Sequence, residues 1–235
     1  MKNKKENFLS RNLKKSINDL KKYKNYFWTI FLIFFASGII GLAFPIFFKE
    51  QIIKLITELI EKTKGLSTFE LIRFIILNNT QSAFLGLILG IFVGIFPILM
   101  ILLNGYVLGF VVNKSVIAEG VLILWRLFPH GVFEIPAIII SAGLGLMIGF
   151  SLMKNCLTNY DKKMKKETMF FLILLSVIFF PISFLIYFIF TFSDKKLKKS
   201  FLKNITNSLR IFIFIVIPLL LIAGIIEGLL IGIIN

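Results

Sequence analysis

The sequence has very few of the residues that build covalent scaffolds and metal centres. Its 235 residues include one cysteine and one histidine. One cysteine excludes a disulfide scaffold. One histidine cannot supply the His-Glu-x-x-His pair of a zinc protease, and one histidine with one cysteine is too little for an ordinary zinc site. Ser141-Ala142-Gly143 lacks a nucleophile elbow. We therefore expect no metal, no cofactor and no enzymatic activity.

Charged residues are missing from four long stretches: the 24 residues 25–48, the 40 residues 74–113, the 19 residues 135–153 and the 26 residues 168–193. From Ile211 to Asn235 the only charged residue is Glu227. A helix needs about 20 mainly apolar residues to cross a bilayer. The sequence therefore predicts an all-α, polytopic helical membrane protein with about five to six transmembrane helices. Its 57% hydrophobic content excludes a disordered chain.

The charge-free stretches also locate the spans. We expect them at about 26–48, 69–95, 98–113, 129–152 and 206–233, with the second and third joined near Phe96-Pro97. Residues 115–128 are apolar but too short to cross, which predicts a broken or re-entrant helix near 115–130, interrupted at Phe128-Pro129. Residues 50–63 form an amphipathic pattern, and Ser67 with Glu70 has the form of a capping box.

Positive charge is concentrated outside the apolar stretches. The chain has 27 Lys or Arg against 12 Asp or Glu, and residues 1–24 carry nine of the cations. Leu9, Leu13, Ile17 and Leu20 recur there at helical spacing, which predicts an amphipathic helix on the cytoplasmic membrane surface; a disordered basic tail is the alternative. We divide the chain into a basic cytoplasmic segment, 1–25, and one transmembrane domain, 26–235. The expected partners are anionic lipid headgroups, with protein partners at the membrane surface, and not nucleic acid.

The topology of the second half depends on the stretch 168–193. With the N-terminus in the cytoplasm, a crossing here leaves 14 cations inside and 13 outside. A hairpin that turns back at Pro181 gives 20 inside and 7 outside. The positive-inside rule favours the hairpin, whereas the length of the stretch favours a crossing. A third arrangement, in which 115–128 crosses, would reverse everything after it. The hairpin is our prediction.

Glycine recurs at every fourth position along several predicted spans. This spacing places glycines on one helix face, where two backbones can approach closely. Packing inside one chain is the simpler interpretation; homo-oligomerisation, with a dimer favoured, is the other, and both can hold. The ten helix-packing glycines are Gly86, Gly90, Gly94, Gly105, Gly109, Gly145, Gly149, Gly224, Gly228 and Gly232.

A few polar groups remain within the apolar part of the sequence. His130 and Glu134 are four residues apart and therefore share a helical face. Ionisable groups at membrane depth are costly, which makes them candidates for function. A structural lock is favoured over a substrate or proton path, because buried ion pairs often specify one packing. The candidate cluster is Glu119, Arg126, His130, Glu134, Glu227, Asn79 and Asn104.

Several of these residues form a pattern that resembles the stage II sporulation protein M family. The pattern consists of Asn78-Asn79, Asn104-Gly105-x-x-x-Gly109, Pro129-His130-Gly131-x-x-Glu134-x-Pro136-Ala137, Ser141-Ala142-Gly143-x-Gly145 and the segment from Pro218 to Glu227. The resemblance runs from about Phe74 to Asn235, and Pro-His-Gly-x-x-Glu is its most specific part. The apolar stretch 168–193 departs from the family pattern.

The resemblance implies an integral membrane protein that is a scaffold and not itself an enzyme. In sporulating bacteria such a protein holds cell-wall hydrolases at the septum during engulfment. We therefore expect a multi-pass protein of the cell membrane that acts as a scaffold or membrane-remodelling factor. The alternative is a small transporter, channel or lipid-moving protein, with a polar path at the helix break near Pro129.

Overall fold

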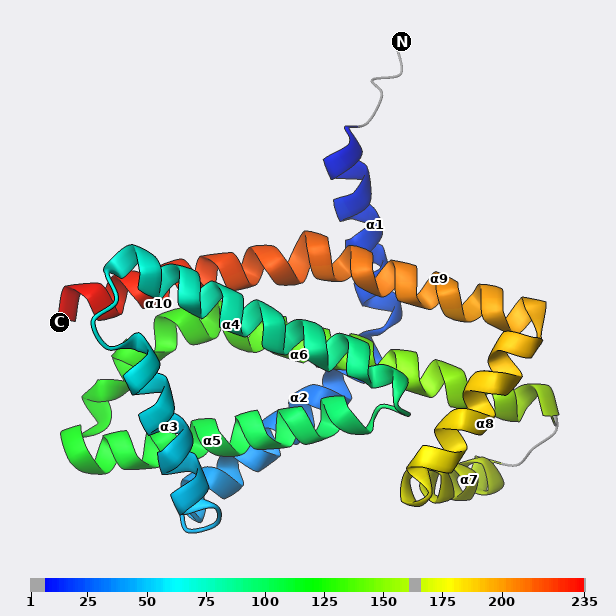
Figure 1. Cartoon of the computed structure of the whole chain (residues 1–235), viewed down its shortest axis with the longest axis horizontal. Coiled ribbons are helices and arrows are strands. Elements are labelled where there is room, and N and C mark those ends of the chain that lie inside the picture. Colours follow the sequence, from blue (N-terminus) through cyan, green and yellow to red (C-terminus); the bar gives the residue numbers. More distant parts are fainter. Residues whose placement is uncertain (1–6, 161–165, 235) are drawn as a thin grey trace.

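The computed structural model describes residues 7–160 and 166–234, and within them the ordered elements are helices joined by short turns (Figure 1). The elements are α1 (Phe8–Lys22), α2 (Lys24–Ala43), α3 (Lys49–Thr63), α4 (Thr68–Ile88), η1 (Leu89–Ile91), α5 (Ile95–Glu119), η2 (Val121–Ile123), α6 (Leu124–Tyr160), α7 (Lys166–Ile178), α8 (Phe180–Ser193), α9 (Lys195–Ile211), the π-helical η3 (Phe212–Val216) and α10 (Ile217–Ile234). The expectation of an all-α polytopic protein is confirmed.

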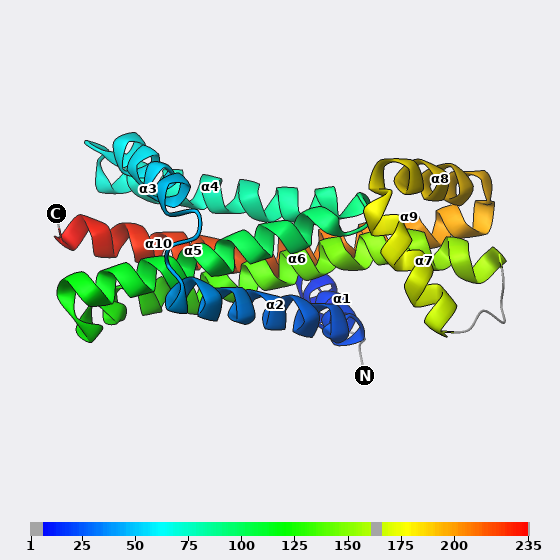
Figure 2. The same cartoon turned by 90° about the horizontal axis from the view of Figure 1, so that it is seen from below.

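Within residues 7–160 and 166–234, five helical segments are long and apolar enough to cross a membrane. They are Lys24–Ala43, Thr68–Ile91, Ile95–Glu119, Gly131–Lys154 and Lys195–Ile233. Their axes lie roughly along one direction (Figures 1 and 2). We call the end where α2 begins the proximal end and the end where α10 finishes the distal end. The short amphipathic helix α1 crosses the bundle axis at the proximal side, and α3 crosses it towards the distal end.

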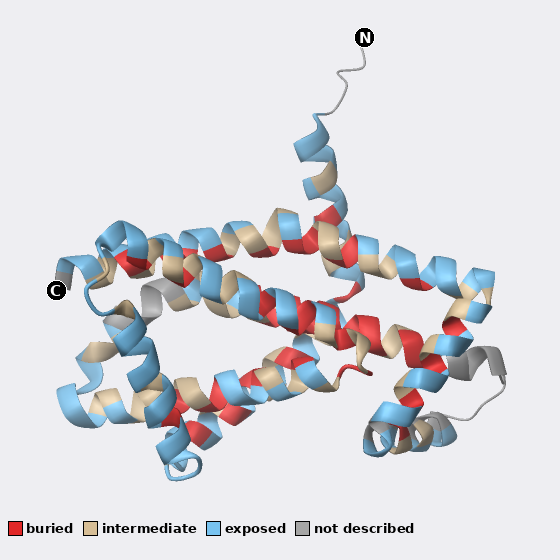
Figure 3. Ribbon diagram, viewed as in Figure 1, coloured by how far each residue is buried: buried red, intermediate tan, exposed pale blue. Residues whose placement is uncertain are grey.

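Helix α6 forms the centre of the bundle and packs against α2, α4, α5 and α10. All nine residues from Ser141 to Gly149 are buried (Figure 3). The Ser141 hydroxyl donates a 2.6 Å hydrogen bond to the carbonyl oxygen of Ala83 on α4. Such a bond between helices is favourable in an apolar surrounding, where neither group could reach water.

The glycine rows lie at contacts between helices of the same chain. A Cβ atom added to Gly90 would lie 2.1 Å from the carbonyl oxygen of Gly145, and one added to Gly109 would lie 2.0 Å from that of Gly38. For each of the ten predicted glycines, an added Cβ would lie between 2.0 and 2.9 Å from an atom of another helix or turn. Packing within one chain therefore accounts for the rows, and the homo-oligomer stays a prediction.

Two predicted turns lie at other residues than expected. Spans two and three are joined at Phe92–Gly94, where Val93 and Gly94 have positive φ (59° and 77°), and Phe96-Pro97 already belongs to the first turn of α5. The helix does break near 115–130, but at Gly120 (φ 80°) and not at Phe128-Pro129. Residues 115–119 end α5, and α6 continues through Pro129. Pro129 is the sixth residue of α6 and lies beyond its first turn, so it costs the helix one backbone hydrogen bond without ending it.

The apolar stretch 168–193 is not one continuous helix. It is divided at Phe179 into α7 and α8, of 13 and 14 residues, and each is too short to span a bilayer. The hydroxyls of Ser176 and Tyr187 lie 2.5 Å apart. A straight helix would separate these residues by about 16 Å along its axis, so the chain is folded at the break. The structure therefore favours the hairpin, although the turn comes two residues before Pro181.

The hairpin lies at the proximal end of the bundle. Tyr187 of α8 packs with Val93 of the α4–α5 turn and with Met153 of α6. Helix α6 ends on this side of the bundle, and α9 begins here before it continues into α10. The charged ends of α6 and α9 therefore both lie at the proximal end (Figure 2). Helix α1 is ordered and packs against α9, where Asp19 forms an ion pair with Arg210. This agrees with the predicted amphipathic helix and not with the disordered tail.

We predict that the contact between Gly90 and Gly145 is essential for stability. Gly90→Ala would place a methyl group against backbone atoms that cannot move aside, so the free energy of unfolding should fall by about 1–3 kcal/mol, measured by steric trapping in detergent. Gly131→Ala is the matched control, because its added Cβ would meet only Ile135 Cδ1 at 3.6 Å. Equal effects of the two substitutions would contradict the packing described.

A second prediction concerns the hairpin. In a Cys156→Ser background, single cysteines at the exposed positions Ser10, Glu58 and Ser200 should react with an impermeant maleimide from defined sides of the membrane. We expect Ser10→Cys and Ser200→Cys to be labelled from the same side and Glu58→Cys from the opposite side. Labelling of Ser200→Cys together with Glu58→Cys would show that residues 168–193 cross.

Candidate functional site: a cavity at the distal end

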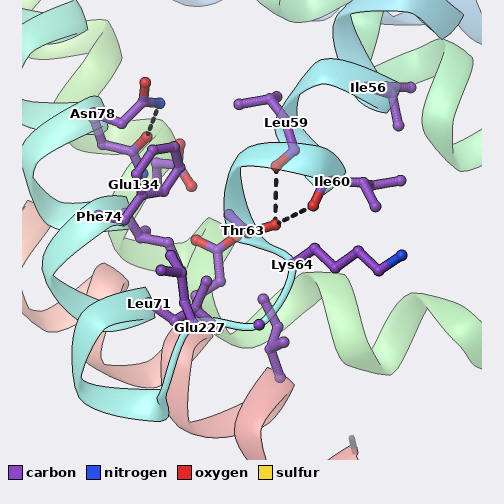
Figure 4. A pocket seen from close by; sticks show the side chains of 15 residues that line it. Ile56, Leu59, Ile60, Thr63, Lys64, Leu71, Phe74, Asn78, Glu134 and Glu227 are labelled. Carbon is purple, nitrogen blue, oxygen red and sulfur yellow. Dashed lines mark hydrogen bonds between the residues drawn. The ribbon is translucent and has the colours of Figure 1, made fainter.

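A cavity of ≈ 550 Å³ lies between α3, α4, α6 and α10 (Figure 4). We call it the distal cavity. Its walls are mostly aliphatic side chains of α3 and α4, and its polar groups are Thr63, Lys64, Asn78, Asn79, Glu134 and Glu227. The capping box of Ser67 and Glu70 sets the start of α4 next to it, since both of its hydrogen bonds are present.

Two carboxylates from different helices point into the distal cavity. Glu134 lies on α6 and Glu227 on α10, and Figure 4 shows both among the side chains that face the space under α3. Among the residues that the structure describes, neither carboxylate has a hydrogen-bond or ion-pair partner. Charged groups within transmembrane segments usually pair or face a water-filled space. The cavity provides that space, and Lys64 is the one described cation on its wall.

The amide groups of the cavity are bound locally. The Asn78 side-chain nitrogen donates to the Asn79 side-chain oxygen at 3.3 Å. The Thr63 hydroxyl lies 2.9 and 3.1 Å from the carbonyl oxygens of Leu59 and Ile60 on its own helix. These bonds fix the polar rim while the two carboxylates remain accessible as hydrogen-bond acceptors.

Glu134 also borders a second, smaller cavity. This space of ≈ 230 Å³ lies between α2, α5 and α6 and includes Asn104 on its wall. Asn104 donates to the carbonyl oxygen of Met100 at 2.8 Å, so its amide bonds its own helix and not a neighbouring one. Glu134 therefore stands between two hollows at the distal end.

The predicted cluster is only partly brought together. Glu134, Glu227 and Asn79 share the distal cavity, and Asn104 joins them through the second hollow. Glu119 lies at the exposed end of α5. The side chains of Arg126 and His130 lie outside the described part of the structure, so a lock between them and the glutamates stays a prediction.

Sequence reasoning missed the contribution of α3. Thr63 and Lys64 lie at its C-terminal end and line the cavity opposite the two glutamates. The amphipathic pattern of 50–63 was the available signal, because the apolar face of a helix next to a span is expected to pack against the other helices. Its Ile52 is buried with Tyr106 and Phe110 of α5, which fixes α3 across the distal end.

A densely packed layer lies on the proximal side of the distal cavity. Here the buried run from Ser141 to Gly149 meets the end of α4 and η1, between Ala83 and Gly90, at backbone contact. The cavity is therefore a recess in one end of the bundle. Its acceptor groups fit a cationic or hydrogen-bond-donating ligand, and in the described residues no group of three His, Cys, Asp or Glu side chains is placed to hold a metal ion.

Comparison with known proteins agrees with the sequence pattern. The uncharacterized protein MJ0706 of Methanocaldococcus jannaschii is 34% identical over 112 residues, which cover 45% of this chain and 49% of the relative. The chain thus matches about half the length of that relative. No solved structure matches this chain. The family model of stage II sporulation protein M matches residues 27–230, which include the five spans almost completely and both glutamates. The chain therefore belongs to the stage II sporulation protein M family.

Proposed function

We propose that this protein is a non-enzymatic scaffold that binds and shapes the membrane in which it is embedded, with its proximal end and N-terminus in the cytoplasm. The observation that carries the proposal is the apolar hairpin α7–α8 at the proximal end, beside two basic amphipathic helices. The family is not a known enzyme family, in agreement with this proposal.

The hairpin presents a large apolar surface. Its exposed apolar side chains include Ile178, Ile182, Ile186 and Ile189, which are 57–63% exposed. At a rise of 1.5 Å per residue each helix is about 20 Å long, less than the roughly 30 Å of hydrocarbon in a bilayer. Such a hairpin can insert into one leaflet only, and added area in one leaflet favours curvature.

Helix α1 supports the same proposal. Its buried residue is Ser16, whereas Leu9, Leu13 and Ile17 are exposed. A helix that buries a serine against the protein and turns its leucines outward is suited to lie in the interface of the bilayer. The ion pair of Asp19 with Arg210 attaches this helix to α9.

The basic groups support the proposed orientation. The lysines of α9 at 195, 196, 198, 199 and 203 are exposed at the proximal end, as are those of α1 at 14, 15, 21 and 22. Cations of membrane proteins are enriched on the cytoplasmic side, where they also attract anionic lipid headgroups. Both basic helices therefore fit a cytoplasmic proximal end.

Transport of a small cation is the second candidate, and the distal cavity with its two carboxylates is the observation that favours it. The packed layer between Ala83 and Gly149 favours the scaffold, because helices at backbone contact leave little room for a permeating molecule. The two functions differ in whether the distal cavity can be reached from the proximal side.

We predict that the distal cavity opens to one side only. In the Cys156→Ser background, Glu227→Cys should react with a cationic methanethiosulfonate from the distal side and not from the proximal side of oriented proteoliposomes. Leu220→Cys, at a buried position on the same helix, is the unreactive control. Reaction of Glu227→Cys from both sides, or ion flux that Glu227→Gln abolishes, would favour transport and overturn the scaffold.

A further prediction tests the hairpin directly. Reconstitution at high protein density should convert round vesicles into tubules or smaller vesicles, observed by electron cryomicroscopy. The triple substitution of Ile182, Ile186 and Ile189 by Asn should remove most of this effect, because it makes the exposed face of α8 polar. The same three positions changed to Leu should keep it.

The unfolding midpoint of the bundle should be the same in both triple variants, because these side chains face away from the helical core. Vesicles that stay round with the wild-type protein at every density would overturn membrane remodelling.

A further inference from the structure

A narrow apolar furrow follows α2 along the outside of the bundle. It consists of three adjoining hollows of ≈ 210, ≈ 580 and ≈ 180 Å³. The first two share Phe31 and Ile139, and the second and third share Phe35, Leu108 and Val112. Because they share lining side chains, the three hollows lie end to end along α2, from Lys24 at the proximal end to Leu42 near the distal end. We call this furrow the α2 furrow.

The α2 furrow arises from the way in which three helices meet. Helix α2 lies directly on α5, because Gly38 and Gly109 allow the backbones to touch. At its proximal end α2 also touches α6, where an atom of Phe27 lies 2.4 Å from the Cβ position of Gly143. Further along, Gly131 has no side chain to fill the space between α6 and α2, and α5 forms the floor.

The furrow is open to the bilayer, and among the described residues that line its three hollows the one charged side chain lies at the proximal end. Trp28, Phe35 and Ile39 on its α2 wall are 60%, 45% and 65% exposed. Lys24, the first residue of α2, lines its proximal hollow together with Trp28. Lysine and tryptophan at the end of a span are typical of the level of the lipid headgroups. The other described residues that line the three hollows are apolar or glycine.

We propose that the α2 furrow binds one anionic phospholipid, with its phosphate beside Lys24 and an acyl chain along α2. The charge at the proximal end and the apolar length of the furrow match the two parts of such a molecule. This site does not depend on the proposed scaffold function, and it lies on another face of the bundle than the distal cavity.

A helix of a second copy fits the α2 furrow less well. An α-helix with its side chains is about 10–12 Å wide, whereas this furrow is divided into small hollows by single side chains. Helix pairs in membranes meet through small residues. The walls here are Phe31, Phe35 and Ile139, and the glycine rows are already in contact within the chain. A flexible acyl chain can follow such a surface.

The test uses the tryptophan inside the site. The chain has two tryptophans, so Trp125→Phe leaves Trp28 as the only one. In vesicles that contain brominated phosphatidylglycerol or brominated phosphatidylcholine at equal mole fraction, quenching of Trp28 reports which lipid lies next to it. We expect phosphatidylglycerol to be preferred by about fivefold, which corresponds to about 1 kcal/mol for one lysine near the membrane surface.

Two pairs of variants separate a bound lipid from general attraction to a basic surface. Lys24→Gln should remove the preference for phosphatidylglycerol, while Lys195→Gln, which removes one charge from the same end outside the furrow, should keep it. Val132→Phe, which fills the furrow, should reduce quenching by either lipid. Leu103→Phe, on an exposed surface of α5 outside the furrow, should not.

Equal quenching by both lipids in the parent protein would overturn the site. An equal loss of preference in Lys24→Gln and Lys195→Gln would also overturn it, because the effect would then arise from surface potential alone. If the preference survives Val132→Phe with unchanged quenching, no acyl chain occupies the furrow and the proposal fails.

Discussion

Close contact between backbones holds this bundle together. Lipid tails are as apolar as leucine, so burial of apolar side chains gives little driving force between helices inside a bilayer. Dispersion contacts and a few hydrogen bonds must supply it, and both require helices to approach closely. Gly86 and Gly145 bring α4 to α6, Gly149 brings the α4–α5 turn to α6, and Gly228 brings α10 to Ile72 of α4. Gly38 and Gly109 bring α2 to α5 in the same way, and the remaining elements pack on this glycine-lined centre through side-chain contacts.

The rigid centre leaves the two ends free to differ. At the distal end α3 is fixed across α5 by Ile52, Tyr106 and Phe110, and the Tyr106 hydroxyl lies 2.8 and 2.7 Å from the carbonyl oxygens of Phe44 and Phe47. Helix α3 thereby covers the distal cavity, which is lined by Glu134 and Glu227. At the proximal end, basic helices and a short apolar hairpin extend the bundle sideways. The protein thus offers acceptor groups to one side of the membrane and cations with apolar surface to the other.

The sequence predicted those features that depend on composition along the chain. The charge gaps located the five spans, and the four-residue glycine spacing identified the contact faces, because both signals are local. Which face meets which helix is not local, so neither the pairing of α4 with α10 nor the place of Thr63 and Lys64 opposite Glu134 could be inferred. The break near 120 was predicted at Phe128-Pro129, because proline suits the first position of a new helix. A glycine with positive φ breaks a helix more completely than a proline near its start.

The two glutamates of the distal cavity cost free energy, because they are partly removed from water. Glu134 and Glu227 are two acidic side chains at the edge of the membrane interior, and each must lose much of its water to lie there. Leucine at either position would fill the hollow and favour close packing. A protein whose only task was to pack five helices would gain from such a replacement. Under the proposed scaffold function, the acid pair is favourable where a cationic group, from this chain or from outside, occupies the recess and replaces the lost water.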